Sequence, residues 1–155
     1  MIVISNASPL IALSRIDLLH LLKDLFADVY IPDSVYQETV TNCDIILQKT
    51  RISQATHEFI KVVVPTVQHV FSRRLGAGEQ GVLNLALEKH AQLVLIDDKK
   101  ARREALELGL VPAFTTDILK RAEHQRLIVS YQQVVQGLQK LGIYLPESSS
   151  GTTFK

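Results

Sequence analysis

The residues of this sequence that could do chemistry are an amide, two carboxylates and two hydroxyls that directly follow short apolar runs. They are Asn6 after residues 2–4, Asp97 and Asp98 after residues 92–96, and Thr115 and Thr116 after residues 111–114. Such runs are typical of buried strands. The carboxyl ends of parallel strands share one edge of a sheet, where open α/β sheets bind their ligands. We therefore expect an acceptor-rich cleft at that edge.

Two further carboxylates are expected to join this cleft. Glu38 belongs to a helix predicted after the second strand, and Glu79 opens the helix that leads to the Asp97 strand. Several carboxylates in one cleft shift one another's pKa values unless a cation neutralises them. Hard oxygen ligands favour Mg²⁺ or Mn²⁺, which can promote attack of water on a phosphodiester. The candidate catalytic and metal-binding residues are Asn6, Glu38, Glu79, Asp97 and Asp98.

Each of these side chains also has a structural interpretation. Asp98 and Glu79 stand at predicted helix starts, where a negative charge is favourable. Asn6 could cap the turn that follows it through local backbone hydrogen bonds. Ser8 is expected to be the N-cap of a helix that starts at Pro9. It is the joint placement of the carboxylates at one sheet edge that favours a functional site.

The elements that would position these residues alternate between strand and helix. Strands are expected at residues 2–4, 29–31, 92–96 and 111–114, residues 62–64 are a strand or a linker, and residues 143–145 could add an edge strand. Helices are expected after Pro9, at 18–26, from 33 or 34 to 40, at 82–90, at 99–108, around 119–122 and at 131–141. This alternation predicts an α/β fold, a parallel sheet covered by helices on both faces.

Composition sets limits on the function. The chain has 155 residues, 46% of them hydrophobic, which suits one domain with a sizeable core. A net charge of +1 neither requires nor excludes a polyanionic partner. The sequence has no pattern of a secretory signal or a membrane span, and its single cysteine cannot form an internal disulfide. We expect a cytoplasmic protein with no membrane contact.

Basic residues near the cleft predict contacts with a polyanion. Lys99, Lys100, Arg102 and Arg103 begin the helix after Asp98, and Arg73 and Arg74 precede the stretch that carries Glu79. They could contact the phosphates of single-stranded RNA without reading its bases, or they could form a solvated helix face. The candidate substrate-binding residues are Ser8, Lys99, Arg102, Thr115 and Thr116.

A competing motif lies in the same region. Residues 76–81 read G-A-G-E-Q-G, so that Gly76, Gly78 and Gly81 form a G-x-G-x-x-G pattern ahead of a helix. This pattern is typical of dinucleotide binding when a buried strand precedes it. Residues 71–75 are a poor strand candidate, and a glutamate in the loop would repel a pyrophosphate. Dinucleotide binding is therefore a minor alternative.

Four stretches together resemble the PIN-domain superfamily, and most closely its DUF3368 branch. They are ISNASPLIALSRIDLLHLL, YIPDSVYQETV, GAGEQGVLNLALEKHAQLVLIDDKKARREALELGL and TTDILKRAEHQRLI. The resemblance extends to about Leu145. It implies a three-layer α/β/α sandwich with a central parallel β-sheet, formed by a single domain over residues 1–146 with a flexible tail at 147–155. It also implies a metal-dependent ribonuclease site, as in the VapC toxins of toxin–antitoxin pairs.

Carried over by position, the resemblance implies roles for the residues of the cleft. Asn6 falls where the superfamily usually has an aspartate, Glu38 where a glutamate follows the second strand, and Glu79 where an acidic residue opens the central helix. Either Asp97 or Asp98 matches the aspartate after the next strand. Thr115 or Thr116 falls where a further polar or acidic residue often sits, and Arg102 also fits the DUF3368 branch.

Asn6 leaves two functions open. An amide oxygen can still bind a hard cation, but it brings no negative charge, so metal affinity should fall. The first function is an endoribonuclease that uses Mg²⁺ or Mn²⁺ to cleave single-stranded RNA. The second is a catalytically weak or inactive PIN-like protein that binds RNA or a protein. The resemblance also implies a homodimer and a small antitoxin protein as partner.

Overall fold

The computed structural model describes residues 1–148, and its core is a five-stranded parallel sheet. The strands are β1 (Val3–Ser5), β2 (Val29–Pro32), β3 (Ile60–Val63), β4 (Leu93–Leu95) and β5 (Pro112–Ala113), in the order β3-β2-β1-β4-β5. The chain builds outward from β1 to β3, returns to the other side of β1, and continues to β5. The direction of winding therefore switches between β1 and β4, which is where open α/β sheets leave a crevice.

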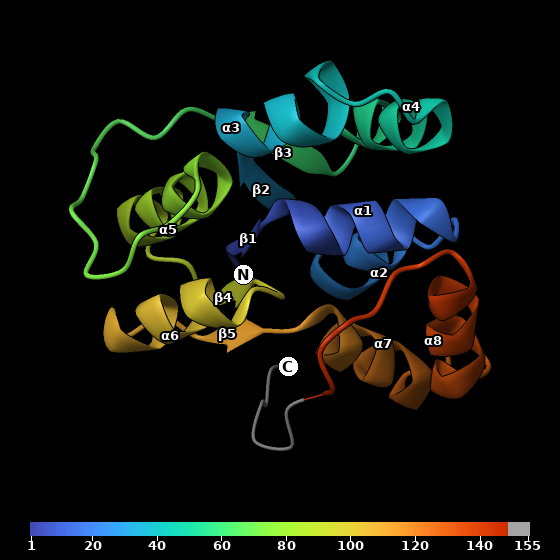
Figure 1. Ribbon diagram of the computed structural model, residues 1–155. Coiled ribbons are helices and arrows are strands. Elements are labelled where there is room, and N and C mark those ends of the chain that lie inside the picture. The colour runs from blue at the N-terminus through green and yellow to red at the C-terminus, as the bar shows by residue number, and fades with distance from the viewer. Residues whose placement is uncertain (149–155) are drawn as a thin grey trace.

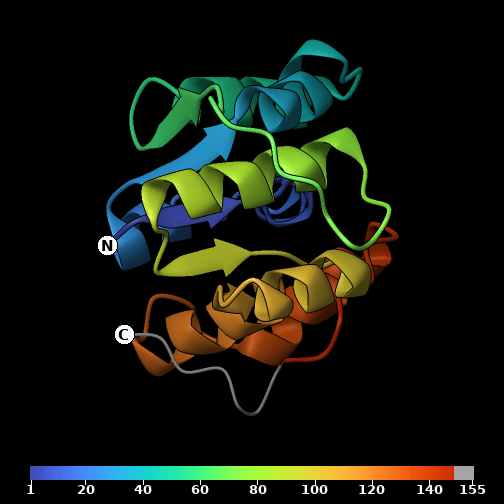
Figure 2. The same cartoon turned by 90° about the vertical axis from the view of Figure 1, so that its left-hand side faces the viewer.

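Helices cover both faces of this sheet. They are α1 (Ala7–Arg15), α2 (Leu21–Phe26), α3 (Asp33–Tyr36), the π-helical segment η1 (Gln37–Thr41), α4 (Ile46–Ala55), α5 (Ala77–Lys89), α6 (Lys99–Glu107), α7 (Thr115–His124) and α8 (Tyr131–Lys140). Figures 1 and 2 show α5 and α6 on one face and α1, α2 and α7 on the other, with α8 against α7. The predicted three-layer α/β/α sandwich is confirmed.

The two central strands are apolar because both of their faces are covered. Val3, Ile4 and all residues of β4 are fully buried. β1 and β4 pair in a register that joins Ser5 to Leu95. The backbone N–H of Asn6 extends this ladder by donating to Leu95 O at 2.9 Å. The chain is therefore fixed at Asn6 before α1 begins.

The start of α1 differs from the prediction. The helix begins at Ala7, so Ser8 lies in its first turn, and the N-cap position belongs to Asn6. Asn6 has an extended backbone, with φ −79° and ψ 176°, and its side chain makes no capping hydrogen bond. The expectation that Ser8 is the N-cap is wrong, because the sheet contact at Leu95 holds the preceding residue extended. Local capping also does not account for the Asn6 side chain.

The segment after α8 does not form the predicted edge strand. Residues 143–145 follow the positive-φ residue Gly142, and Ile143 N donates to Leu138 O at the end of α8. The backbone then continues past α7, where Thr116 Oγ1 donates to Pro146 O at 2.7 Å. Residues 149–155, most of the tail predicted to be flexible, lie outside the described residues.

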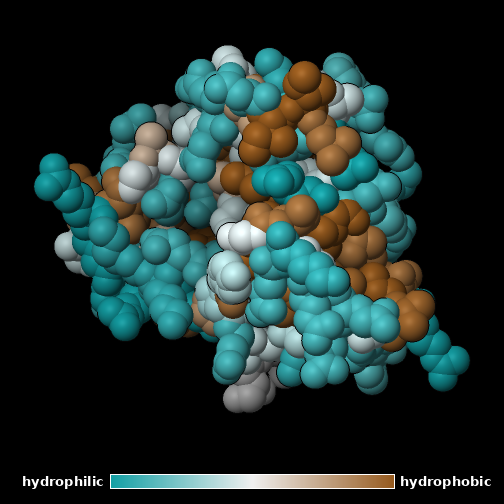
Figure 3. Space-filling view, turned by 45° about the vertical axis from the view of Figure 1, so that its right-hand side comes forward, coloured by the Kyte–Doolittle hydropathy of each residue, from teal (hydrophilic) through white to brown (hydrophobic). Residues whose placement is uncertain are grey.

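Exposed hydrophobic residues occur on the surface of the helical layers. Three of them, Ile45, Ile46 and Leu47, lie at or just before the start of α4. Figure 3 shows hydrophobic side chains in several patches that hydrophilic side chains separate. Within residues 1–148, none of the helices combines the length and apolar character needed to cross a bilayer. The predicted homodimer stays a prediction.

Candidate active site

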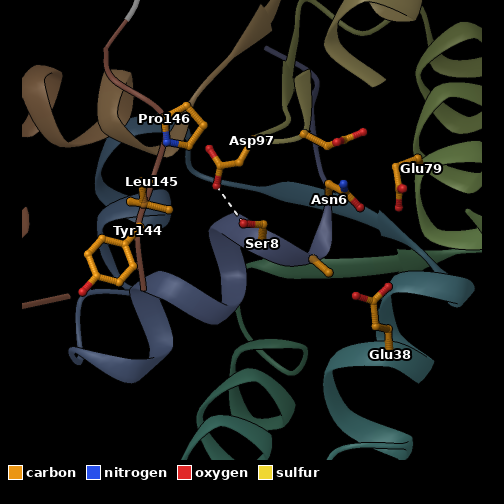
Figure 4. Close-up of a pocket in the computed structure, with 10 residues that line it drawn as sticks. Asn6, Ser8, Glu38, Glu79, Asp97, Tyr144, Leu145 and Pro146 are labelled. Atoms are coloured by element: carbon orange, nitrogen blue, oxygen red, sulfur yellow. Dashed lines mark hydrogen bonds between the residues drawn. The ribbon is translucent and has the colours of Figure 1, made fainter. Parts of the chain in front are cut away.

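A pocket of about 430 Å³ opens at the carboxyl ends of β1 and β4, at the switch point of the sheet. Its lining residues are Asn6, Ala7, Ser8, Glu38, Glu79, Asp97, Asp98, Tyr144, Leu145 and Pro146. All five candidate catalytic residues and Ser8 thus share one pocket, although they come from the ends of β1 and β4 and from α1, η1 and α5 (Figure 4). The sheet edge that the sequence predicts as a cleft is therefore a cleft.

Asp97 is the most constrained carboxylate of the pocket. It is 7% exposed, and its Oδ1 accepts a hydrogen bond from Thr115 N at 2.7 Å. Its Oδ2 accepts from Thr115 Oγ1 at 2.7 Å and from Ser8 Oγ at 2.9 Å. Burial raises the pKa of Asp97, and these hydrogen bonds oppose the rise. The side chain therefore joins the end of β4 to the first turns of α1 and α7.

Asp98 has a different task at the same strand end. It occupies the N-cap position of α6, and its Oδ2 accepts a hydrogen bond from Ala101 N at 2.9 Å. A carboxylate there satisfies a free helix N–H and interacts favourably with the helix dipole. Asp97 and Asp98 both line the pocket, and each also has a structural role.

Asn6 carries an unsatisfied polar atom into the pocket. Its Oδ1 is buried and accepts no hydrogen bond, although the residue is only 5% exposed. Buried polar atoms in native proteins nearly always have a hydrogen-bond partner, so we expect Asn6 Oδ1 to contact a ligand, an ion or a water. The Asn6 amide in Figure 4 points to the side of the pocket where Glu38 and Glu79 lie.

Gly78 explains how Glu38 reaches the same place. A Cβ at Gly78 would lie 2.9 Å from Glu38 Oε1 and 3.6 Å from Asn6 Oδ1. Glu38 belongs to η1, and Gly78 lies in the first turn of α5. The absence of a side chain at position 78 therefore lets oxygens from two separate elements approach the backbone of α5. Single π-helical turns of the kind seen in η1 are frequent at functional sites.

Glu38 and Glu79 interact through their charges. Partial burial raises the pKa of Glu38, and the negative charge of Glu79 raises it further. Glu79 stands in the first turn of α5, where the helix dipole favours a carboxylate. The two glutamates therefore favour a positive charge between them, or a proton on Glu38.

These donors fit a hard cation in part. Amide and carboxylate oxygens are the ligands that Mg²⁺ and Mn²⁺ take, and such ions keep several waters. Asn6 Oδ1 accepts no hydrogen bond, and within residues 1–148 no hydrogen bond ends on the carboxylates of Glu38 and Glu79. Over the same residues, however, no three His, Cys, Asp or Glu side chains are grouped closely enough to hold a metal. The set is thus one amide and two carboxylates.

The remaining candidate substrate residues do not line the pocket. Thr115 and Thr116 are buried, and their hydroxyls donate to Asp97 and to Pro146 O. Arg102 places its guanidinium 4.3 Å from the centre of the Phe114 ring and donates to Pro112 O. Lys99 is exposed at the first position of α6. Thr115, Thr116 and Arg102 therefore stabilise the edge of the sheet. A substrate in the pocket would not reach the two threonines.

The glycine motif is a packing device. α5 begins at Ala77, so Gly78 and Gly81 lie inside the helix, and residues 64–76, directly before it, contain no strand. A Cβ at Gly81 would overlap Ser34 Oγ and press on Pro32. The small residues therefore let α5 pack closely on α3 and the end of β2. The dinucleotide-binding alternative is wrong, because the fingerprint needs a strand before it and a loop around it.

One wall of the pocket was not predicted from the sequence. Tyr144, Leu145 and Pro146 lie opposite the glutamates (Figure 4). These residues follow the last helix and reach the pocket through contacts with α7. No local sequence pattern marks such a long-range contact, and their apolar character predicts an edge strand equally well.

Comparison with known proteins agrees with this architecture. The chain matches the DUF3368 family, described as a PIN domain, over residues 2–153. Among solved structures it is similar to a PilT N-terminus domain protein from the hyperthermophilic archaeon Sulfolobus solfataricus P2. The TM-score is 0.56 at 18% identity, and the match covers 79% of this chain and 93% of that one. None of the curated proteins gives a significant match. The chain therefore belongs to the DUF3368 family of PIN domains.

Proposed function

We propose that this protein is a PIN-type endoribonuclease that hydrolyses single-stranded RNA with the help of Mg²⁺ or Mn²⁺. The observation that carries the proposal is the buried, unpartnered Asn6 Oδ1, which faces the side of the pocket that holds Glu38 and Glu79. A hard cation would give Asn6 Oδ1 a partner and would neutralise the negative charges of Glu38 and Glu79. PIN-domain membership supports a nuclease fold around the same pocket.

The pocket residues divide the work between them. Glu38, Glu79 and Asn6 would hold the ion, which when bound supplies a positive charge for the phosphate and activates a water. The raised pKa of Glu38 lets this carboxyl hold a proton more readily than an ordinary glutamate does. Asp97 positions Ser8 and Thr115 at the pocket wall, and Asp98 fixes the start of α6. The exposed Lys99 could meet RNA phosphates outside the pocket.

A catalytically weak or inactive protein is the second candidate. It is favoured by the amide at position 6 and by the lack, in residues 1–148, of a group of three acidic, histidine or cysteine side chains suited to a metal. Such a protein would use the same cleft to bind RNA or a protein. A small antitoxin and a second copy of this chain remain proposed partners.

Calorimetry with Mn²⁺, together with cleavage of a mixed single-stranded RNA, tests the first proposal. We expect the wild type to bind Mn²⁺ weakly and to cleave, Asn6→Asp to bind more tightly, and Glu79→Gln to lose both binding and cleavage. Asp44→Asn is the matched control, because Asp44 is exposed and does not line the pocket. It should change neither property.

The same samples separate the two candidates. No binding or cleavage in the wild type, with both restored by Asn6→Asp, would identify a PIN site that has lost its activity. Binding that is unchanged in both Glu38→Gln and Glu79→Gln would contradict the proposed ligand set. If Asp44→Asn loses as much Mn²⁺ binding as Glu79→Gln does, surface charge and not the pocket attracts the ion.

A further inference from the structure

The pocket has two chemically different sides. Asn6, Glu38 and Glu79 form the acidic side, while Tyr144, Leu145 and Pro146 form the opposite wall (Figure 4). The hydrogen bond from Ser8 to Asp97 lies between them. A nucleotide has the same asymmetry, because its phosphate is charged and its base is flat and largely apolar on its faces. The volume of about 430 Å³ falls within the usual range of small-ligand pockets.

The wall opposite the glutamates is held in place by the body of the protein. Pro146 O accepts a hydrogen bond from Thr116 Oγ1 at 2.7 Å, and Ser148 Oγ donates to Asp117 Oδ1 at 2.8 Å. Asp117 Oδ2 in turn accepts from Phe114 N at 2.8 Å. Leu145 is partly buried against the core. Residues 144–146 are therefore attached to the start of α7 on the far side of Asp97.

Tyr144 is the exception within this anchored segment. Its neighbours Ile143 and Leu145 are partly buried, but Tyr144 is 75% exposed at the rim of the pocket. A large aromatic side chain on a fixed backbone loses little conformational freedom when a flat ligand stacks on it. Stacking on aromatic side chains is the common way in which proteins hold unpaired bases of single-stranded RNA.

We propose that Tyr144 is a stacking platform for a nucleobase next to the phosphate held at the acidic side of the pocket. The substrate is then RNA with an unstacked base at this position, and a paired duplex binds more weakly because that base must first be unpaired and unstacked. This inference rests on the proposed function for the position of the phosphate. It adds the residue that binds a base of that RNA.

The chain offers a direct spectroscopic test because it contains no tryptophan. Tyr144→Trp introduces a single indole at the rim, and Val129→Trp is the matched control at a 95% exposed position that does not line the pocket. Both proteins are mixed with a short single-stranded RNA in Mg²⁺. Fluorescence is read by stopped flow before turnover, and the products are then analysed on a gel.

Base stacking predicts a specific pattern. The RNA should quench the indole at position 144 and leave the one at position 129 unchanged. A strand of the same length and charge with abasic sites should quench neither. Tyr144→Ala should raise the half-saturating RNA concentration about tenfold, and Tyr144→Phe should bind like the wild type, because stacking needs the ring and not the hydroxyl.

Failure of this inference is distinguishable from failure of the proposed function. Equal quenching by abasic and ordinary RNA, or equal quenching at positions 144 and 129, would overturn the role of Tyr144 even if cleavage continued. Base-dependent quenching without cleavage, with no cleavage in Asn6→Asp either, would support base binding and refute the nuclease. Tyr144→Ala that changes the mass in light scattering but not RNA affinity would make Tyr144 an interface residue, which also overturns the proposal.

Discussion

Asp97 and Asn6 follow neighbouring strands and line the same pocket, but their side chains have opposite hydrogen-bonding states. Asp97 accepts three hydrogen bonds from Thr115 and Ser8. Asn6 Oδ1 accepts none, although it too is buried. A buried polar group without a partner costs free energy, typically about 1–3 kcal/mol. The fold therefore uses Asp97 as a brace and leaves Asn6 available for a ligand.

This comparison changes the meaning of a carboxylate at a strand end. A carboxylate at a strand end can stabilise the fold or bind a metal. The hydrogen-bond partners of its oxygens distinguish the two roles. Both carboxylate oxygens of Asp97 accept hydrogen bonds, whereas the charges of Glu38 and Glu79 repel each other. We expect substitutions on the first side to affect stability most and substitutions on the second side to affect metal binding most.

The largest effect is expected from Asp97→Ala. This change leaves the buried Thr115 N–H and hydroxyl without an acceptor and frees the Ser8 hydroxyl. We expect the free energy of unfolding to fall by about 3 kcal/mol, measured by urea denaturation. Ser8→Ala is the control, because it removes only one of the three hydrogen bonds and should cost about 1 kcal/mol. Unchanged stability with loss of Mn²⁺ binding would instead make Asp97 a metal ligand.

The second effect separates stability from binding at one residue. Gly78→Ala places a Cβ 2.9 Å from Glu38 Oε1, so the glutamate must move away. Alanine is favoured over glycine within a helix by about 1 kcal/mol, so stability should hold or rise. Mn²⁺ affinity should fall about tenfold, a loss of about 1.4 kcal/mol, measured by calorimetry. Gly137→Ala in α8, where nothing lies near the added Cβ, is the control.

Substitutions of Asp98 should have a smaller effect. They also test whether Asp98, rather than Asp97, is the aspartate that serves the pocket. Asp98→Ala removes the acceptor for Ala101 N and should cost about 1 kcal/mol, as the loss of an N-cap does. Asp98→Asn keeps a capping oxygen, so its unfolding free energy should match the wild type in the same urea titration. A loss of Mn²⁺ binding in Asp98→Asn at unchanged stability would show that the charge serves the pocket as well as the helix.

The sequence is sufficient to predict the sheet edge and most of its residues. β1, β2 and β4 are apolar runs because helices cover both faces of the sheet, and Asn6 and Asp97 follow from where these runs end. Glu79 follows from its position at the start of the helix that leads to β4. These features depend on local patterns, so they can be identified without coordinates.

The errors all come from contacts between distant residues. Ser8 fits an N-cap locally, but with the hydrogen bond of Asn6 to Leu95 the helix starts at Ala7, two residues earlier than that cap would start it. Residues 143–145 are apolar enough for a strand. However, β5 has only two residues, and one of them is Pro112, which has no N–H for a further ladder. The position of Tyr144 at the pocket likewise depends on contacts with α7 that no local pattern encodes.

The smallest effect concerns pH and the pair of glutamates. The pKa of Glu38 lies above its ordinary 4.5 in the folded protein because of burial and the charge of Glu79. The folded state therefore binds this proton more tightly than the unfolded chain, and the stability it contributes is lost as the pH rises from 4.5 through the raised value. Glu38 is an exposed residue, so solvent screening limits the effect to about 0.5 kcal/mol.

Glu79→Gln tests this coupling without touching Glu38. It should raise stability slightly at pH 7 without metal and reduce the slope of stability against pH above 4.5, as measured by thermal unfolding. Asp97 also has a raised pKa, but it is present in both proteins, so its contribution cancels in the difference. With Mn²⁺ the wild type should become more stable than Glu79→Gln, because the ion binds the two charges that repel each other in its absence. If Glu79→Gln is more stable than the wild type both with and without Mn²⁺, the two glutamates only repel each other and do not bind the ion together.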